Sequence, residues 1–254
     1  MGDLKMSSLA KGLQVIQQFA YEKETWGVRE IAKRLGLSKS TAFRLLQALC
    51  DQEFLAINQE TKKYEIGSDL WRLGVALRGK ETLHATAMSA IRKYADAVNE
   101  MMGFFRYGHG GVIYEGIAEC DHALRFGLRL GIPYGIDKGP AGKILLAFLP
   151  LEETSKIYKK LEEDPSTDIE TLKKHVKQVR DNGYCSTKGE RTAGITGFAA
   201  PIMGPRNVLL GGVGLYVPDA RYKPKERQKY IHTVKACAGE ISSIVNPRGS
   251  AETS

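Results

Sequence analysis

Residues 39–50 combine three polar side chains that could recognise DNA with four apolar ones that could anchor a helix. At about 100° per residue, Ser40, Arg44 and Gln47 point to one side of a helix. An arginine can hydrogen-bond bidentately to a guanine edge, and a serine or a threonine such as Thr41 can reach a base or a phosphate. The opposite side carries Ala42, Leu45, Leu46 and Leu49. This spacing predicts a helix that packs through its leucines and enters a DNA major groove with its polar side.

The stretch before this helix, Leu-Gly-Leu-Ser at 35–38, predicts a sharp turn that exposes the helix start. Gly36 permits the turn, Leu37 anchors it, and Ser38 caps a helix whose first amides attract phosphate. Five basic residues and one acid lie between Val28 and Arg44. The alternative is a solvated polar face, as most charged helix faces are. The predicted DNA-contacting residues are Lys11, Arg29, Ser38, Lys39, Ser40, Thr41, Arg44, Gln47, Lys62 and Lys63.

The elements that must position these residues are three helices and a hairpin. Apolar residues at Leu9, Leu13, Ile16 and Phe19 predict a first helix over 7–23, and a second follows at 28–36. Two alternating runs within 53–67 flank the polar turn Asn58-Gln59-Glu60-Thr61, which predicts a hairpin carrying Lys62 and Lys63 as a wing. We therefore expect a winged helix-turn-helix domain over 7–68 and a linker helix over 69–82.

The second half of the chain predicts an α+β domain over 83–250. Its expected helices lie at 81–102, 143–149, 168–182 and 225–245, the third capped by Thr167 with Glu170 and stopped by Gly183. The expected strands lie within 104–119, 122–130, 197–203 and 208–217.

Composition restricts the class of protein further. The chain has 254 residues, 43% of them apolar, and a formal net charge of +8, which suits a polyanionic partner. Its four cysteines lie far apart with no CxxC pair, so no zinc site or disulfide framework is expected. No apolar run approaches the ~20 residues that span a bilayer. A cytoplasmic protein without membrane contact, metal or cofactor is the expectation.

Over nearly its whole length the chain resembles the IclR family of bacterial transcriptional regulators. The segments that carry the resemblance are SLAKGLQVIQQF at 8–19, EIAKRLGLSKSTAFRLLQAL at 30–49, YEIG at 64–67, ETLHATAMSAIRKYA at 81–95, IPYGIDKGPAGKILLAFLP at 132–150, RDNGYCSTKGERTAGITGFAAPI at 180–202 and GGVGLYV at 211–217. The resemblance implies a winged helix-turn-helix, a linker helix and a GAF-like domain that binds a small effector. It also implies dimers or tetramers on double-stranded, pseudo-palindromic operators.

Carried over residue by residue, the resemblance implies an effector pocket lined by Pro140, Ala141, Thr187, Ile195, Gly197, Gly214 and Tyr216. Where family members that bind small acids have an acidic residue, a cysteine and two serines, this chain has Thr187, Gly197, Gly214 and Tyr216. The approach segment, GIPYGIDKGPAGK, is also slightly longer. These departures favour an effector other than a small keto acid.

An acidic or aromatic effector suits this region, since Lys188, Arg191 and Tyr216 could pair with a carboxylate. The alternatives are that Tyr216 belongs to the core and that Lys188 and Arg191 form a solvated loop. Glu190 is expected to bond to neighbouring backbone amides.

Two other functions compete with operator binding. In an enzyme, GPAGK at 139–143 could be a phosphate loop, but Asp137 and Ile144 occupy the positions where a Walker A motif needs Gly and Ser or Thr. No HxxxH or GxSxG pattern occurs, so no catalytic residue is expected. The second competitor is a helix-turn-helix whose basic face binds an acidic protein. Operator binding would prefer particular sequences, whereas a charge-only contact would show salt dependence alone.

Overall fold

The computed structural model describes residues 7–78, 82–124 and 126–246, and the chain divides into two units, Met1–Glu81 and Thr82–Ser254. The end of the expected linker helix and residues 247–250 of the expected second domain lie outside the described residues. Each unit has its own hydrophobic core.

The N-terminal unit consists of helices and a short hairpin, as predicted: α1 (Ser8–Tyr21), α2 (Val28–Leu35), α3 (Lys39–Asp51), β1 (Leu55–Ile57), β2 (Tyr64–Ile66) and α4 (Ser68–Arg78). Gly36 ends α2 in the left-handed conformation, with φ of 64°, which a residue without a side chain adopts freely. Ser38 then caps α3. The core of the unit is formed by Val15, Phe19, Trp26, Ile31, Ala42, Leu46, Leu55 and Tyr64.

The apolar stripe predicted for α1 is only partly buried. Phe19 lies in the core, but Leu9 and Leu13 are 75% and 54% exposed, and Val15 is buried in their place. The first turns of α1 lie outside the core because the helix packs through its second half. Helix α4 is similarly uncovered, since Trp71 and Val75 are 71% and 68% exposed.

Glu30 ties the hairpin to α2. Its carboxylate accepts hydrogen bonds from the Lys23 ammonium at 2.8 Å and from the Gly27 amide at 2.6 Å, and Lys63 lies 3.6 Å away. These contacts, led by the hydrogen bond from Lys23, lower the pKa of Glu30 from 4.5 to about 2.

Because the pKa of Glu30 is lowered, we expect the stability of the N-terminal unit to decrease at low pH. Since the pKa of Glu30 is lower in the folded state than in the unfolded state, its ionised carboxylate stabilises the fold. This contribution to the free energy of unfolding is present above about pH 4.5 and is lost as the pH falls towards 2. Its size stays below about 1 kcal/mol because the side chain is 39% exposed and solvent screens the charges. Glu30→Gln should therefore flatten the dependence of stability on pH in this range, whereas the exposed Glu60→Gln should not. Tryptophan fluorescence would follow this unit alone, because Trp26 and Trp71 are the two tryptophans of the chain.

The C-terminal unit is built on a six-stranded antiparallel sheet in the order β5-β4-β3-β8-β7-β6. Its elements in chain order are α5 (Thr82–Val98), β3 (Met101–Gly108), β4 (Gly111–Ala118), β5 (Pro133–Tyr134), α6 (Gly139–Phe148), α7 (Leu151–Leu161), α8 (Ile169–Asn182), β6 (Cys185–Lys188), β7 (Ile195–Met203), η1 (Pro205–Asn207), β8 (Leu209–Pro218), η2 (Pro224–Glu226) and α9 (Arg227–Val245).

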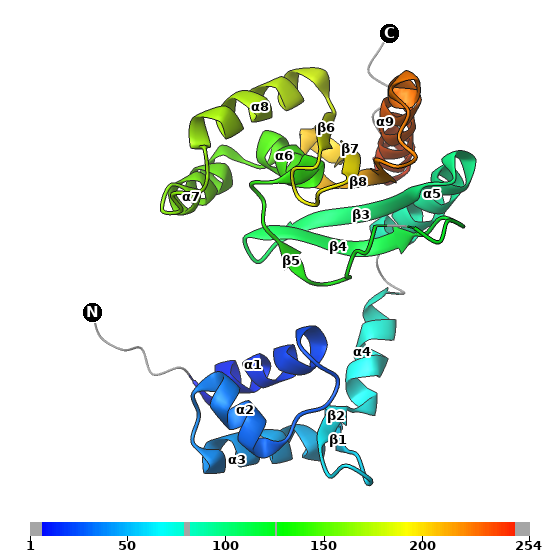
Figure 1. Ribbon diagram of the computed structural model, residues 1–254. Coiled ribbons are helices and arrows are strands. Elements are labelled where there is room, and N and C mark those ends of the chain that lie inside the picture. The colour runs from blue at the N-terminus through cyan, green and yellow to red at the C-terminus, as the bar shows by residue number, and fades with distance from the viewer. Residues whose placement is uncertain (1–6, 79–81, 125, 247–254) are drawn as a thin grey trace. The chain divides into compact units, whose positions relative to one another are not determined.

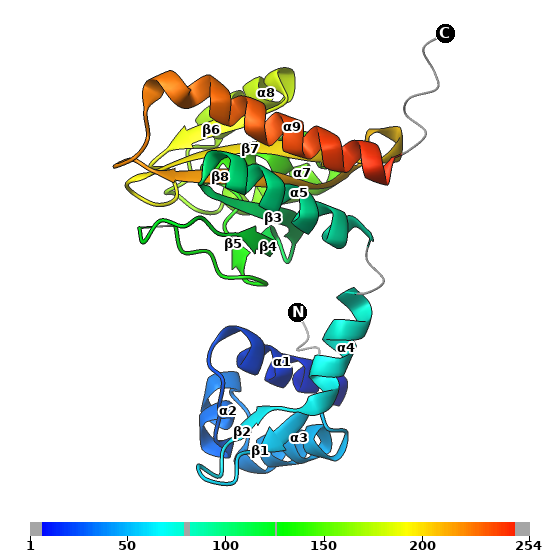
Figure 2. The same cartoon turned by 90° about the vertical axis from the view of Figure 1, so that its right-hand side faces the viewer.

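Helices cover both faces of this sheet. Figure 2 shows α5 and α9 side by side on one face, where they bury Ile91, Phe104 and Val234 with the strands. Helices α6 and α8 pack on the other face around Phe105, Ile144 and Val176 (Figure 1). Alternate residues of the central strands therefore supply two separate cores. The expected α+β class is confirmed.

Several predicted boundaries in this unit were wrong. The helix expected over 81–102 ends at Val98, because Asn99 adopts φ of 49° and Met101 starts β3. The run at 122–130 is not a strand in its described part: its alternating Phe126 and Leu128 pack against the core instead of pairing at a sheet edge.

The predicted run at 104–119 holds two strands, β3 and β4, with His109 and Gly110 between them. Helix α6 begins earlier than the predicted 143, at Gly139, and α9 begins at Arg227. Helix α8 is capped by Asp168, which accepts from the Thr171 amide at 3.0 Å, so the predicted Thr167 capping box does not form. Strands β5 and β6 and helix α7 were not predicted.

A buried ion pair joins the connection between α5 and β3 to the segment after β8. The Arg221 guanidinium, after β8, donates to both carboxylate oxygens of Glu100 at 2.9 and 2.7 Å. Only 5% of the Glu100 side chain is exposed. Arg221 also donates to the carbonyl of Leu124 at 2.6 Å, so one side chain holds the segment after β4 to the sheet.

Candidate DNA-binding surface and ligand pocket

The start of α3 is organised by the Ser38 hydroxyl. It accepts from the Thr41 amide at 3.2 Å and donates to the Thr41 hydroxyl at 2.9 Å, and the Ser40 hydroxyl lies 3.1 Å away. Ser38, Lys39 and Ser40 are all exposed. The cap therefore leaves the N-terminal end of α3 open to solvent, where an anion can approach its amides.

Arg44 and Gln47 are exposed further along α3, about two and two and a half turns from the cap, while Ala42 and Leu46 are fully buried on the other side of the helix. Within residues 7–78, Arg44 makes no hydrogen bond or ion pair, so its five donors are available to a partner. The Gln47 amide donates to the Asp51 carboxylate at 2.9 Å, which leaves its carbonyl oxygen free to accept.

Sequence reasoning missed Phe43, which is 49% exposed beside Arg44. The helical period places it on the flank of the polar face, and its apolar character is what could have marked it, because an exposed aromatic residue on a DNA-facing helix can contact a thymine methyl group.

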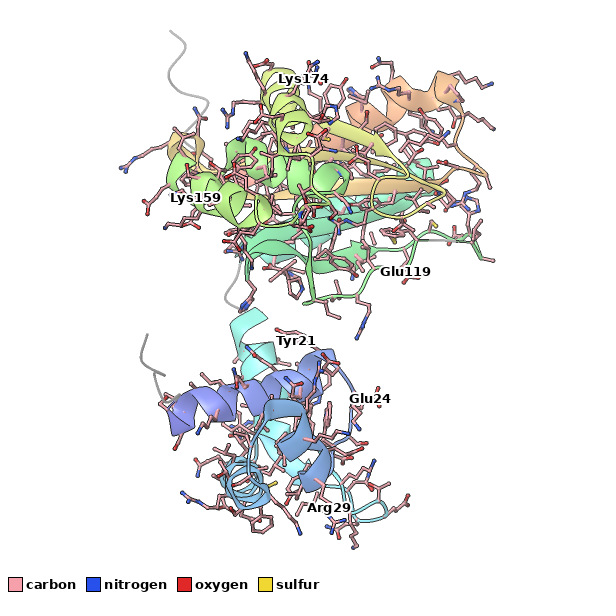
Figure 3. All side chains as sticks on the ribbon, turned by 60° about the vertical axis from the view of Figure 1, so that its left-hand side comes forward. Tyr21, Glu24, Arg29, Glu119, Lys159 and Lys174 are labelled. Atoms are coloured by element: carbon pink, nitrogen blue, oxygen red, sulfur yellow. The ribbon has the colours of Figure 1, made fainter. Side chains whose placement is uncertain are left out.

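The other predicted contact residues lie on α1, α2, α3 and the hairpin. Lys39 is exposed at its first turn, Arg29 is exposed on α2 (Figure 3), and Lys11 is half-buried on α1. The hairpin turn is formed by Asn58, whose side-chain oxygen accepts from the amides of Glu60 and Thr61.

The two wing lysines differ in their environment. Lys62 is exposed, and its ammonium lies 3.5 Å from the side-chain oxygen of Gln59. Lys63 is half-buried and lies 3.6 Å from the Glu30 carboxylate. Lys62 is thus the freer of the two to contact phosphate, whereas part of the charge of Lys63 is engaged inside the unit.

In the C-terminal unit, six of the eight predicted effector-contacting residues line one small apolar cavity between the sheet and α6, called the inner cavity below. They are Pro140, Ala141, Thr187, Ile195, Gly197 and Tyr216. The cavity has a volume of only about 20 Å³. Tyr114, Phe126, Glu190, Arg191 and Thr192 complete its lining. Tyr114 and Phe126 were missed because they come from β4 and the segment after it, far away in the sequence.

Two predicted effector-contacting residues do not line this inner cavity. Lys188 is exposed, and its ammonium lies 3.7 Å from the Asp219 carboxylate. Gly214 lies behind Tyr216, where an added Cβ would be 2.4 Å from the tyrosine hydroxyl. Gly214 therefore shapes the cavity from beneath.

Charged side chains around the inner cavity are paired with the protein itself. Glu190 accepts from the Gly139 amide at 3.2 Å, as expected, and also from the buried ammonium of Lys143. The Arg191 guanidinium donates to the carbonyls of Gly135 and Lys138 and stacks 5.6 Å from the centre of the Tyr134 ring.

A second cavity of about 260 Å³ lies between α8 and β6. It is open and mostly polar, with Lys143, His175, Ser186 and Arg227 among its lining residues. It is the larger of the two, but the lining of the inner cavity has more aromatic and apolar side chains, which suit a small organic molecule. We therefore regard the inner cavity as the better ligand site.

The described residues hold no helix long and apolar enough to cross a membrane. Within 7–78, 82–124 and 126–246, no three His, Cys, Asp or Glu side chains gather to hold a metal ion. 

Comparison with known families decides what these two sites belong to. The family model of the bacterial transcriptional regulator IclR C-terminal domain matches residues 79–243, and that of the IclR helix-turn-helix domain matches residues 8–56. The chain belongs to the IclR family. Helix α3 is therefore the second helix of an IclR helix-turn-helix, and the chain is a DNA-binding transcriptional regulator rather than an enzyme.

Individual relatives agree with this assignment. The transcriptional regulator KdgR of Escherichia coli (strain K12) is 26% identical over 243 residues, which cover 94% of this chain and 92% of KdgR. The IclR regulator of Alicyclobacillus acidocaldarius has a TM-score of 0.82 at 21% identity, covering 94% of this chain and 98% of that structure. An IclR homologue of Microbacterium hydrocarbonoxydans, solved with 4-hydroxybenzoate, has a TM-score of 0.81 at 22% identity, covering 94% and 99%.

Proposed function

We propose that this IclR regulator binds a pseudo-palindromic operator as a homodimer, or as a dimer of dimers, in the cytoplasm. A small organic effector, acidic or aromatic, occupies the inner cavity and changes operator affinity. The observation that carries the DNA-binding part is Arg44, an exposed guanidinium without an intramolecular partner in residues 7–78, on a helix held down by Ala42 and Leu46.

The roles of the DNA-contacting residues follow from their positions. Arg44 contacts a guanine edge, while Ser40, Thr41 and Gln47 contact bases or phosphates in the same groove. Contacts to the phosphate backbone come from Lys11, Arg29, Ser38, Lys39, Lys62 and Lys63, and they fix the register of the helix without reading sequence.

Self-association is supported by the uncovered apolar side chains of the N-terminal unit. Leu9 and Leu13 on α1, and Trp71, Leu73 and Val75 on α4, are all exposed. Apolar side chains in such number mark surfaces that another protein covers, and a second copy of the chain is the partner that would also duplicate α3. Two copies related by a twofold axis would place their α3 helices on half-sites about one helical turn apart, or a multiple of that.

The effector part of the proposal depends on the inner cavity. Its lining includes six residues that the family resemblance assigns to the effector, and its apolar character suits an organic ligand. The Microbacterium relative was solved with 4-hydroxybenzoate, which supports an aromatic ligand here.

Selection of binding sequences from random DNA, followed by fluorescence anisotropy at several salt concentrations, tests operator binding. The proposal expects enrichment of a two-half-site sequence, with specific binding roughly 10³-fold or more tighter than binding to random DNA. Salt dependence without any sequence preference would instead indicate a basic face that recognises an acidic partner.

Lys62→Ala tests the role of the wing. Because a phosphate contact carries no sequence information, the variant should weaken binding to operator and to random DNA by the same factor. The slope of log K against log salt should decrease in magnitude by about 0.9 for each phosphate contact that is lost, and a homodimer loses one such contact in each half-site. Lys63→Ala is the matched comparison and should also weaken both DNAs, since that residue keeps a proposed phosphate contact. A loss confined to the selected operator would show that Lys62 reads bases instead.

A further inference from the structure

Two tyrosines fill the space at the centre of the inner cavity. Tyr114 on β4 and Tyr216 on β8 are only 1% and 4% exposed, and their ring centres lie 6.1 Å apart. Their hydroxyls hydrogen-bond to each other, which satisfies both in an otherwise apolar surrounding. Burial raises the pKa of Tyr114 to about 12 and that of Tyr216 well above its ordinary value, so both phenols are neutral.

Glycines on three neighbouring strands provide the room for these rings. Gly103 and Gly214 face each other across β3 and β8, and Gly197 on β7 is the partner of Tyr216. A Cβ atom would lie 2.4 Å from the Tyr216 hydroxyl if added at Gly214, and 2.9 Å from the Tyr114 ring if added at Gly103. The sheet therefore lacks side chains where the two rings lie.

What remains after the rings are in place is too small for an organic ligand. The residual cavity of about 20 Å³ has room for roughly one water molecule. Phe126 covers the Tyr216 ring, with the two ring centres 5.3 Å apart. The site that the family resemblance assigns to an effector is thus occupied by a side chain of the protein.

The free polar groups in this site favour a neutral ligand over a carboxylate. Arg191, the cationic residue in the lining, bonds to two backbone carbonyls. Lys143 and Lys188 do not line the cavity, and they pair with Glu190 and Asp219. A carboxylate entering the site would have to break one of these pairs to be compensated. A phenol would need only a hydroxyl partner, which Tyr114 already provides to Tyr216.

We propose that the Tyr216 phenol is a built-in occupant of the effector site and that the ligand class of the site is a neutral, single-ring phenol, which competes with this side chain for the same space. The inference rests on the proposed assignment of the inner cavity to the effector. An intramolecular occupant weakens the apparent affinity of any competing ligand by the fraction of molecules in which the space is free. The wild-type protein accordingly binds such phenols weakly.

Removing the ring should turn the site into a receptor for its analogue, p-cresol. Tyr216→Ala should lower the melting temperature by about 10 °C, as expected for a buried aromatic side chain. A p-cresol concentration roughly 100 times its Kd should then restore about 5 °C or more. Tyr216→Val, which retains a strand-forming side chain, provides the same measurement if the alanine variant does not fold.

Tyr216→Phe is the matched control, because it keeps the ring and leaves no vacancy. We expect p-cresol to bind Tyr216→Ala at least about tenfold more tightly than it binds Tyr216→Phe or the wild type, and toluene to bind the variant less tightly than p-cresol because it cannot bond to Tyr114. Isothermal titration calorimetry measures all of these affinities. Equal binding of p-cresol to wild type and variant, or none to either vacated variant, would overturn the proposal.

A double-mutant cycle tests the fit between Gly214 and Tyr216 without any ligand. Gly214→Ala should lower the melting temperature by several degrees in the wild type, since the atoms nearest to its Cβ would be those of the Tyr216 side chain. In the Tyr216→Ala background the same change should cost little. Equal losses in both backgrounds would show that the ring does not lie over Gly214.

Operator binding separates this proposal from the proposed function. If p-cresol binds Tyr216→Ala and also changes its affinity for the selected operator, both are supported. If p-cresol binds but operator affinity stays the same, Tyr216 is still the occupant of the cavity, and the assignment of the cavity to the effector is wrong.

Discussion

Replacing Arg44 with alanine is expected to weaken binding to the selected operator by about 5- to 150-fold for each half-site, because each half-site loses one bidentate contact to a base, worth roughly 1–3 kcal/mol. Binding to random DNA should fall much less. The reason is that Arg44 is exposed on the polar face of α3 and, in residues 7–78, has no intramolecular partner whose loss would disturb the fold. Base preference should relax at one position in each half-site.

Fluorescence anisotropy with the operator and with each single-base variant measures both effects. Arg72→Ala is the control, because Arg72 is an exposed arginine on α4 that pairs with Asp69 and lies outside the proposed contact set. Equal losses on operator and random DNA for Arg44→Ala would mean that Arg44 contacts phosphate and that another residue reads the base.

Arg221→Met is expected to destabilise the C-terminal unit by about 3 kcal/mol, because it leaves the carboxylate of Glu100 buried without its partner. The pair is 22% and 5% exposed on its two sides, so solvent compensates little. A loss of this size lowers the melting temperature of a domain this large by roughly 6–12 °C. Thermal unfolding followed by far-ultraviolet circular dichroism would measure it.

The exposed pair between Lys93 and Glu240 provides the control, since 64% of the Lys93 side chain is in solvent. Lys93→Met should leave the melting temperature nearly unchanged. Adding Glu100→Gln to Arg221→Met should recover part of the loss, because an amide is less costly to bury than a carboxylate. Similar melting temperatures for Arg221→Met and Lys93→Met would contradict a buried, structurally important pair.

Sequence reasoning predicted the N-terminal unit well because its signals are local. The period that buries Ala42 and Leu46, the Ser38 cap and the turn at Asn58 each depend on residues within a few positions of one another. The pairing of Lys63 with Glu30 was not predicted, because it joins residues that only the folded hairpin brings together.

In the C-terminal unit, local patterns were less informative. The alternation of Phe126 and Leu128 predicted a strand, but a covering segment that packs every second residue on a core has the same pattern. The family resemblance identified most of the inner cavity, yet it gave no indication that Tyr216 bonds to Tyr114. These two residues are 102 positions apart, and only the order of the strands places them together.

The contacts of Arg191 relate the length of one loop to the identity of a residue in another. Arg191 lies in the turn between β6 and β7, and its guanidinium donates to the carbonyls of both Gly135 and Lys138, in the segment between β5 and α6. Shortening that segment would remove one of these two carbonyl acceptors, so that Arg191 could no longer bridge them. We therefore expect homologues with a shorter segment to lack arginine at the position of Arg191, so that the two features are gained and lost together in evolution.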